Sequence, residues 1–108
     1  MNNNYNRPDD TFGDATARMT QEIFADGVDR AVLLMRHSAR EYRRDIHDLE
    51  NPLTEEGRDL AARFGARLPD VDLRGYSSPV KRCTDTADLA IQGSSAASRG
   101  GVVGKVRD

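Results

Sequence analysis

The sequence predicts a small α/β domain with a parallel sheet. Helical and strand-like patterns alternate along its 108 residues, in the order helix, strand, helix, strand and helix, before the start of another strand. This alternation is typical of parallel sheets, in which helices connect successive strands. The apolar run AVLLM at residues 31–35 has the length and composition of a strand buried on both faces. The chain length is that of one domain.

The first 29 residues are expected to form a tail and a short helix. Residues 1–14 are rich in Asn and Asp, which is typical of a mobile tail. Residues 15–26 are expected to form an amphipathic helix, because three apolar residues stand at helical spacing: Met19, Ile23 and Phe24. Gly27 then gives a stop signal.

A second helix is expected after the strand at 31–35 and a polar loop at residues 41–52. Thr54 can cap its free backbone N–H groups, and Glu55 and Glu56 suit the positive end of the helix dipole. One apolar stripe is made by Leu60, Ala61, Phe64, Gly65 and Leu68. Pro69 ends this helix.

The last predicted elements are a strand, a helix and the start of a third strand. Residues 71–77 form the strand, and Ser78 followed by Pro79 is a helix-start signal. The helix is expected to run to about Ile91 and to bury Val80, Cys83, Ala87 and Ala90. The Gly- and Ser-rich residues 93–101 are expected to be a flexible connection, and VVGKV beyond them to begin the strand.

The composition excludes several classes of partner. The formal net charge is −2, so the chain as a whole lacks the basic surface of a nucleic-acid-binding protein. No segment approaches the ~18 apolar residues that a membrane span needs. The first 14 residues lack the pattern of a secretory signal, and the single cysteine cannot form an intramolecular disulfide. We therefore expect a cytoplasmic protein that binds neither nucleic acid nor membrane.

Two arginine-bearing segments follow the predicted strands. Arg36 and Arg40 flank His37 after the first strand, and Arg82 follows the second. Ligands bind beyond the carboxyl ends of parallel strands, so both segments are expected at one edge of the sheet. Arginine matches phosphate oxygens bidentately, so the three arginines could surround one phosphoryl group. His37 would then be placed to attack phosphorus as a nucleophile.

Other reactive side chains have simpler interpretations. Arg43 and Arg44 fit a solvated loop face, and His47 fits an exposed loop position. Cys83 fits a small core residue. One cysteine with two scattered histidines gives no zinc spacing, so no metal or cofactor is expected.

Three stretches, LLMRHSAR, NPLTEEGRDLAARF and YSSPVKRCTDTA, occur in series between residues 33 and 87. Together they resemble the N-terminal part of the histidine phosphatase superfamily, which has the phosphoglycerate-mutase-like fold. The family carries an Arg-His-Gly motif after its first strand, a Leu-Thr-x-x-Gly helix start and a Ser-Ser-x-x-x-Arg-x-x-x-Thr-Ala segment. Here Ser38 stands in place of the motif's glycine.

The resemblance implies a fold and an activity. It assigns residues 30–108 to the N-terminal part of a histidine phosphatase domain, with a three-layer parallel-type sheet that is truncated here. It implies that His37 is the phosphorylated nucleophile and that Arg36, Arg40 and Arg82 bind phosphate. The substrate would be a small phosphorylated molecule or a phosphoprotein, hydrolysed without a cofactor.

The family's second catalytic histidine has no counterpart here, and no general acid is assigned. We therefore expect impaired activity and self-association through an open sheet edge. The alternatives are a phosphate-binding module without catalysis and a mutase-type phosphotransferase.

Overall fold

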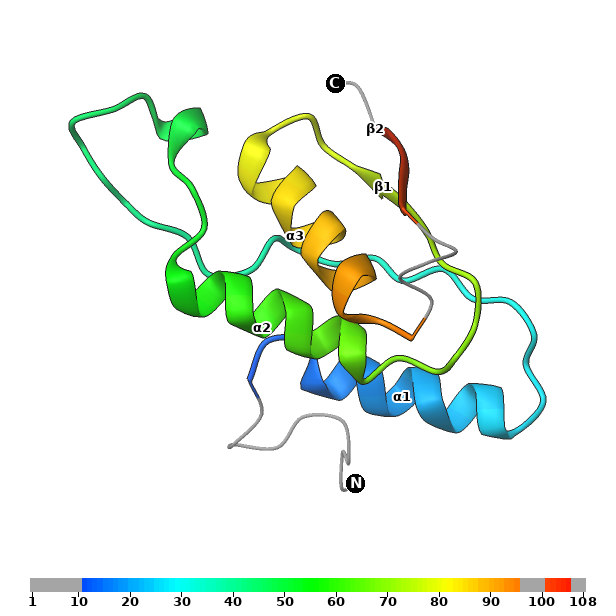
Figure 1. Cartoon of the computed structure of the whole chain (residues 1–108). Helices are drawn as coiled ribbons and strands as arrows, with labels where there is room; N and C mark the ends of the chain where they lie inside the picture. Colours follow the sequence, from blue (N-terminus) through cyan, green and yellow to red (C-terminus); the bar gives the residue numbers. More distant parts are fainter. Residues whose placement is uncertain (1–10, 96–100, 106–108) are drawn as a thin grey trace.

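The computed structural model describes residues 11–95 and the backbone of residues 101–105. Its elements in chain order are α1 (Asp14–Ala25), the 3₁₀ turn η1 (Asp48–Glu50), α2 (Glu55–Ala66), β1 (Arg74–Ser77), α3 (Lys81–Gly93) and β2 (Gly101–Lys105). In Figure 1, α2 lies between α1 and α3, and the two strands lie beyond α3. None of the helices in these ranges is long and apolar enough to cross a membrane.

The strands β1 and β2 pair in parallel, in the register Arg74 to Gly101 through Ser77 to Lys105. The helix α3 connects them, so this part of the chain is a parallel β-α-β unit of the α/β class. The strand expected after residue 101 is therefore confirmed. The described residues form a sheet of two strands, and the three-layer sheet stays a prediction.

The core lies where the three helices meet the extended chain that connects α1 to α2. Ala17, Phe64 and Leu68 form its buried cluster. Partly buried apolar residues pack around this cluster: Phe12, Leu33, Met35, Leu73 and Ala90. The predicted stripe of α2 thus supplies most of the core, and only Leu60 in that stripe is half-buried.

The helix α2 begins as its sequence predicts. The Thr54 hydroxyl accepts a hydrogen bond from the Gly57 N–H at 2.9 Å, which satisfies one of the free donors of the first turn. Gly57 also lies against the main chain of Ala39, because a Cβ there would stand 2.1 Å from the Ala39 carbonyl oxygen. This close approach holds the segment after His37 against the start of α2.

The prediction of a fully buried strand at residues 31–35 is wrong. This stretch is extended but has no ladder partner among the described residues. Leu33 and Met35 face the core, whereas Val32 and Leu34 are 95% and 97% exposed. A strand buried on both faces needs a layer on each side. The described helices cover one side, so alternate side chains point outward.

Residues 11–14 are not part of a mobile tail. Phe12 packs edge-to-face on Phe64, and Asp14 is buried at the start of α1. The helix α1 buries Ala17 and Thr20, while Met19 from the predicted apolar face is 41% exposed. Residues 1–10 of the predicted tail lie outside the described residues. Of the connection predicted for residues 93–101, Gly93 ends α3 and Gly101 begins β2, and residues 96–100 lie outside the described residues.

The helix α3 starts two residues later and buries a different face than predicted. Val80, with an extended ψ of 132°, is the N-cap, and the Ser78 hydroxyl accepts from its N–H in a local turn. The buried residues are Arg82, Thr86 and Ile91, whereas Val80, Cys83, Ala87 and Ala90 are half-buried. Two polar residues, Arg82 and Thr86, therefore occupy the buried positions in the first turns of α3.

Candidate functional site

A loop of residues 41–52 rises from a closed base beside the start of α3. Arg40 and Leu53 form an antiparallel bridge at this base. The Glu41 N–H donates to the Pro52 carbonyl at 2.9 Å, and the Thr54 N–H donates to the Ala39 carbonyl at 2.9 Å. The residues next to His37 are thereby tied to the start of α2.

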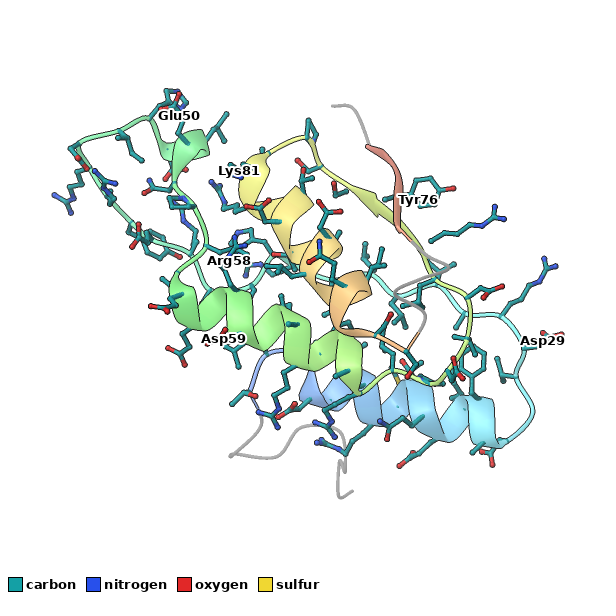
Figure 2. The ribbon with its side chains drawn as sticks, in the orientation of Figure 1. Asp29, Glu50, Arg58, Asp59, Tyr76 and Lys81 are labelled. Carbon is teal, nitrogen blue, oxygen red and sulfur yellow. The ribbon has the colours of Figure 1, made fainter. Side chains whose placement is uncertain are left out.

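Asn51 and His47 order the loop from within. The Asn51 side chain, 1% exposed, accepts from the Arg43 N–H at 2.9 Å and donates to the Arg43 carbonyl at 3.1 Å. The His47 Nδ1 accepts from the Leu49 N–H at 3.2 Å and so caps η1. In Figure 2, this turn, marked by Glu50, lies beside the first turn of α3, marked by Lys81.

Two of the predicted phosphate-binding arginines meet at the carboxylate of Asp48. Arg40 Nη2 pairs with Asp48 Oδ1, and Arg40 Nη1 lies 3.4 Å from Oδ2. Arg82 Nη2 lies 3.8 Å from the same Oδ2, and Arg82 Nη1 donates to the Asp48 main-chain carbonyl at 3.0 Å. Both guanidinium groups can therefore contact a single anionic group.

The arginines are buried and the carboxylate is not. The side chains of Arg40 and Arg82 are 9% and 10% exposed, against 66% for Asp48. The Arg40 guanidinium also stacks 4.3 Å from the centre of the Tyr42 ring, which supports it from one side. Arg82 Nε is buried without a hydrogen-bond partner in the described structure. A donor is thus left for a further acceptor.

The charges at this site fix the protonation of Asp48. Its hydrogen bond with Arg40 and the charges of Arg40 and Arg82 lower the pKa of the Asp48 carboxyl, although partial burial acts in the other direction. The same hydrogen bond raises the pKa of Arg40. Asp48 is therefore a carboxylate at neutral pH and not a proton donor.

The orientation of the His37 ring follows from one contact. His37 Nδ1 lies 2.7 Å from the Ser38 carbonyl oxygen, which can only accept a hydrogen bond. In neutral His37 the proton is therefore on Nδ1, and the lone pair is on Nε2. Since the residue is half-buried, the ring is only partly open to solvent.

Thr86 connects the His37 segment to the turn of α3 that carries Arg82. The Ser38 N–H donates to Thr86 Oγ1 at 3.0 Å, and the Thr86 hydroxyl donates to the Arg82 carbonyl at 2.7 Å. Ser38 is 2% exposed, and its own hydroxyl has no hydrogen-bond partner in the described structure. The backbone next to His37 is thus fixed relative to Arg82.

Arg36 lies apart from this arrangement. It is exposed and forms no hydrogen bond or ion pair with a described residue. Arg43 pairs with Asp45 at 2.6 Å on the loop surface, and Arg44 and His47 are exposed, as expected for a solvated loop. Cys83 is half-buried. The structure therefore unites Arg40 and Arg82, and leaves Arg36 outside.

Two residues of the site were not predicted from the sequence. Asp48 stands in a polar loop, and nothing in that stretch indicates that it reaches Arg82. Thr86 did carry a signal, since it follows Arg82 by one helical turn and residues at that spacing share a face.

The comparisons with known proteins give one match. The family model of the histidine phosphatase superfamily (branch 1) matches residues 32–98. Neither the curated proteins nor the solved structures contain a match to the chain. The matched residues are more than half of the chain and include His37, Arg40, Asp48 and Arg82. The chain belongs to the histidine phosphatase superfamily.

Proposed function

We propose that this protein binds a phosphomonoester group and hydrolyses it through a phosphohistidine formed on His37. One observation carries the proposal. Arg40 precedes α2 in the sequence and Arg82 follows it, yet both arginines contact the carboxylate of Asp48. Guanidinium groups that share one anion can also share a phosphoryl group. We include Arg36 as a third phosphate ligand, because it is adjacent to His37 in the sequence and its exposed side chain is available to a ligand.

The reaction has two steps. First, the His37 Nε2 lone pair forms an N–P bond while the P–O bond to the leaving group breaks, and the leaving oxygen takes a proton from solvent. Water then attacks phosphorus, the N–P bond breaks with its electron pair returning to Nε2, a proton of the water passes to solvent, and inorganic phosphate leaves. Arg40 and Arg82 stabilise the negative charge on the non-bridging oxygens in both steps.

We expect slow turnover by residues 1–108 alone. The leaving group needs a proton, and Asp48 cannot supply it while it is ionised between two arginines. The chain has two histidines, and the side chain of His47 caps η1. Within this proposal the substrate is a small phosphorylated molecule or a phosphoprotein in the cytoplasm.

The same observation supports a second candidate, a phosphate-binding module without catalysis. In this case the two arginines bind a phosphoryl group, and the His37 ring only contributes a hydrogen bond. The ionised state of Asp48 favours this alternative, because it removes a proton donor from the site. The two candidates differ in whether a covalent phosphohistidine forms.

Trapping the intermediate tests the proposal. Protein incubated with a ³²P-labelled phosphomonoester and denatured rapidly in base should retain label that acid removes. We expect the label to be lost in His37→Ala and kept in His47→Asn, where the Asn side-chain oxygen can replace His47 Nδ1 as the acceptor that caps η1. Label that persists in His37→Ala would exclude His37 as the nucleophile, and phosphate binding without any label would select the binding module.

A further inference from the structure

We propose that Asp48 is an intrachain occupant of the anion site, and that a phosphorylated ligand binds by displacing its carboxylate. The inference rests on the proposed function, since it takes Arg40 and Arg82 as phosphate ligands. It adds that the site is filled by the chain itself when no ligand is bound. Asp48 would thereby set the affinity and the specificity of the site.

The contacts of Asp48 resemble those of a bound anion. Its two oxygens lie against both terminal nitrogens of Arg40, in the forked arrangement that arginine forms with carboxylate and phosphate alike. One of these oxygens is also 3.8 Å from Arg82 Nη2. A phosphoryl group that bridged the two arginines would need the same donors, so the carboxylate and the ligand cannot both occupy them.

The carboxylate can leave without unfolding the loop. Its side chain is 66% exposed, and the described structure gives it these two arginines as partners. The loop is held elsewhere, by the Arg40–Leu53 bridge and by the buried Asn51. Rotation of the Asp48 side chain into solvent would therefore free the terminal nitrogens of Arg40 and Nη2 of Arg82 while the backbone of the loop stays in place. Arg82 Nη1 would keep its hydrogen bond to the Asp48 main-chain carbonyl.

The Asp48 carboxylate does not accept a hydrogen bond from every donor of the two guanidinium groups. Arg82 Nε remains buried without an acceptor while Asp48 is in place. A phosphomonoester offers three non-bridging oxygens and up to two negative charges, so it can occupy the position of the carboxylate and supply an acceptor to Nε. A ligand with a single carboxylate gains nothing over Asp48. The arrangement therefore favours phosphoryl groups over monocarboxylates.

A different role for Asp48 gives the opposite result. If its carboxylate serves to hold Arg40 and Arg82 in a binding geometry, removing the charge leaves the arginines disordered and weakens phosphate binding. If it competes with the ligand, removing the charge strengthens phosphate binding. The sign of the change in affinity separates the two roles.

The test is calorimetric titration of the full chain with inorganic phosphate. We expect Asp48→Asn to bind about three- to tenfold more tightly than wild type, the scale of one or two partly exposed ion pairs that no longer compete. Asp45→Asn is the matched control, because Asp45 lies in the same loop and pairs with Arg43 instead. Circular dichroism checks folding, and Asp48→Ser replaces Asp48→Asn if the latter is unfolded.

The outcomes separate this inference from the proposed function. Unchanged or weaker binding by the Asp48 variants, with wild-type binding that Arg82→Ala weakens, would overturn the inference and leave the phosphate site standing. Absence of phosphate binding in wild type and in the Asp48 variants would overturn the phosphate site and the inference with it. Tighter binding in Asp48→Asn and unchanged binding in Asp45→Asn would support both.

Discussion

Burial of Arg82 destabilises the fold, because its hydrogen bonds do not satisfy every donor of the guanidinium group. The residue is 8% exposed, and its Nε has no acceptor in the described structure. A buried donor without a partner is unfavourable by about 1–3 kcal/mol. An unsatisfied guanidinium donor in the first turn of α3 is explained if Arg82 binds a ligand there. Arg82 is therefore the residue through which the phosphate site can be tested most directly.

We expect Arg82→Ala to weaken phosphate binding by roughly 1.5–3 kcal/mol, or about 10- to 150-fold, as for hydrogen bonds to charged groups. The measurement is calorimetry with inorganic phosphate or vanadate. Arg44→Ala is the control, because Arg44 is an exposed arginine of the adjacent loop. If wild type and Arg82→Ala bound phosphate with equal affinity, Arg82 would not be a phosphate ligand.

The hydrogen bond between Ser38 and Thr86 leads to a separate prediction about stability. Thr86→Val keeps the side-chain shape but leaves the buried Ser38 N–H without its acceptor. We expect a loss of about 1–3 kcal/mol in the free energy of unfolding. Urea denaturation measures this change, and Thr86→Ser, which retains the hydroxyl, is expected to lose less. A Thr86→Val variant as stable as wild type would show that this hydrogen bond does not hold the His37 segment in place.

The sequence was sufficient to predict some residues of the site and not others. The proximity of Arg40 and Arg82 could be predicted, because both follow stretches that the sequence predicts to be parallel strands. The two residues do meet at Asp48, although only the second of these stretches forms a strand in the described structure. Asp48 could not, because its position depends on how the loop closes through the Arg40–Leu53 bridge and Asn51. Such contacts between loop residues leave no periodic pattern in a sequence.

At the scale of elements, helices were predicted more accurately than the apolar run. The Thr54 cap and the stripe through Phe64 identified α2, since both signals are local to the helix. Residues 31–35 carry a signal of equal clarity, yet they form no ladder in the described structure. Strand pairing requires a neighbour that is distant in sequence, so an apolar run alone does not determine it.

The contact between α2 and α3 depends on glycine. A Cβ added at Gly65 would stand 1.6 Å from the carbonyl oxygen of Ala90, which is main chain and cannot move aside easily. We expect Gly65→Ala to destabilise the protein by about 1–3 kcal/mol, as overpacking does, despite the better helix propensity of alanine.

Thermal or urea denaturation would measure the effect of Gly65→Ala. Asp59→Ala is the control on the same helix, because Asp59 is exposed on its outer face (Figure 2). A Gly65→Ala variant that is more stable than wild type would mean that helix propensity outweighs the close contact, and that α2 and α3 can separate without loss.

For the whole molecule, α1 lies outside the residues that the family model matches but shares their core. Ala17 packs with Phe64 and Leu68. Asp14 adds a polar connection between the start of α1 and the end of α2, because its carboxylate lies 2.6 Å from Arg67 Nη1 and 3.4 Å from Arg63 Nη2. Burial and ion pairing thus join α1 to the matched domain.

This connection makes the stability of the molecule dependent on pH. Burial tends to raise the pKa of the Asp14 carboxyl, but the hydrogen bonds from Thr11, the charge of Arg63 and the hydrogen bond from Arg67 outweigh it and lower the pKa below 3.8. A carboxyl whose pKa is lower in the folded state stabilises the protein above its unfolded pKa. That contribution is lost as the pH falls through the folded value.

We therefore expect Asp14→Asn to be less stable than wild type at pH 7, and the difference to shrink as the pH falls below about 4, where the unfolded chain begins to bind the proton. Urea denaturation of both proteins at pH 7 and pH 3 measures the difference at each pH. Subtracting the two proteins cancels the contributions of other carboxyl groups, Asp48 included. Asp29→Asn, an exposed position just after α1, is the control and should show no such convergence (Figure 2). A stability difference for Asp14→Asn that is the same at both pH values would mean that hydrogen-bond geometry, and not the charge of Asp14, attaches α1 to the rest of the molecule.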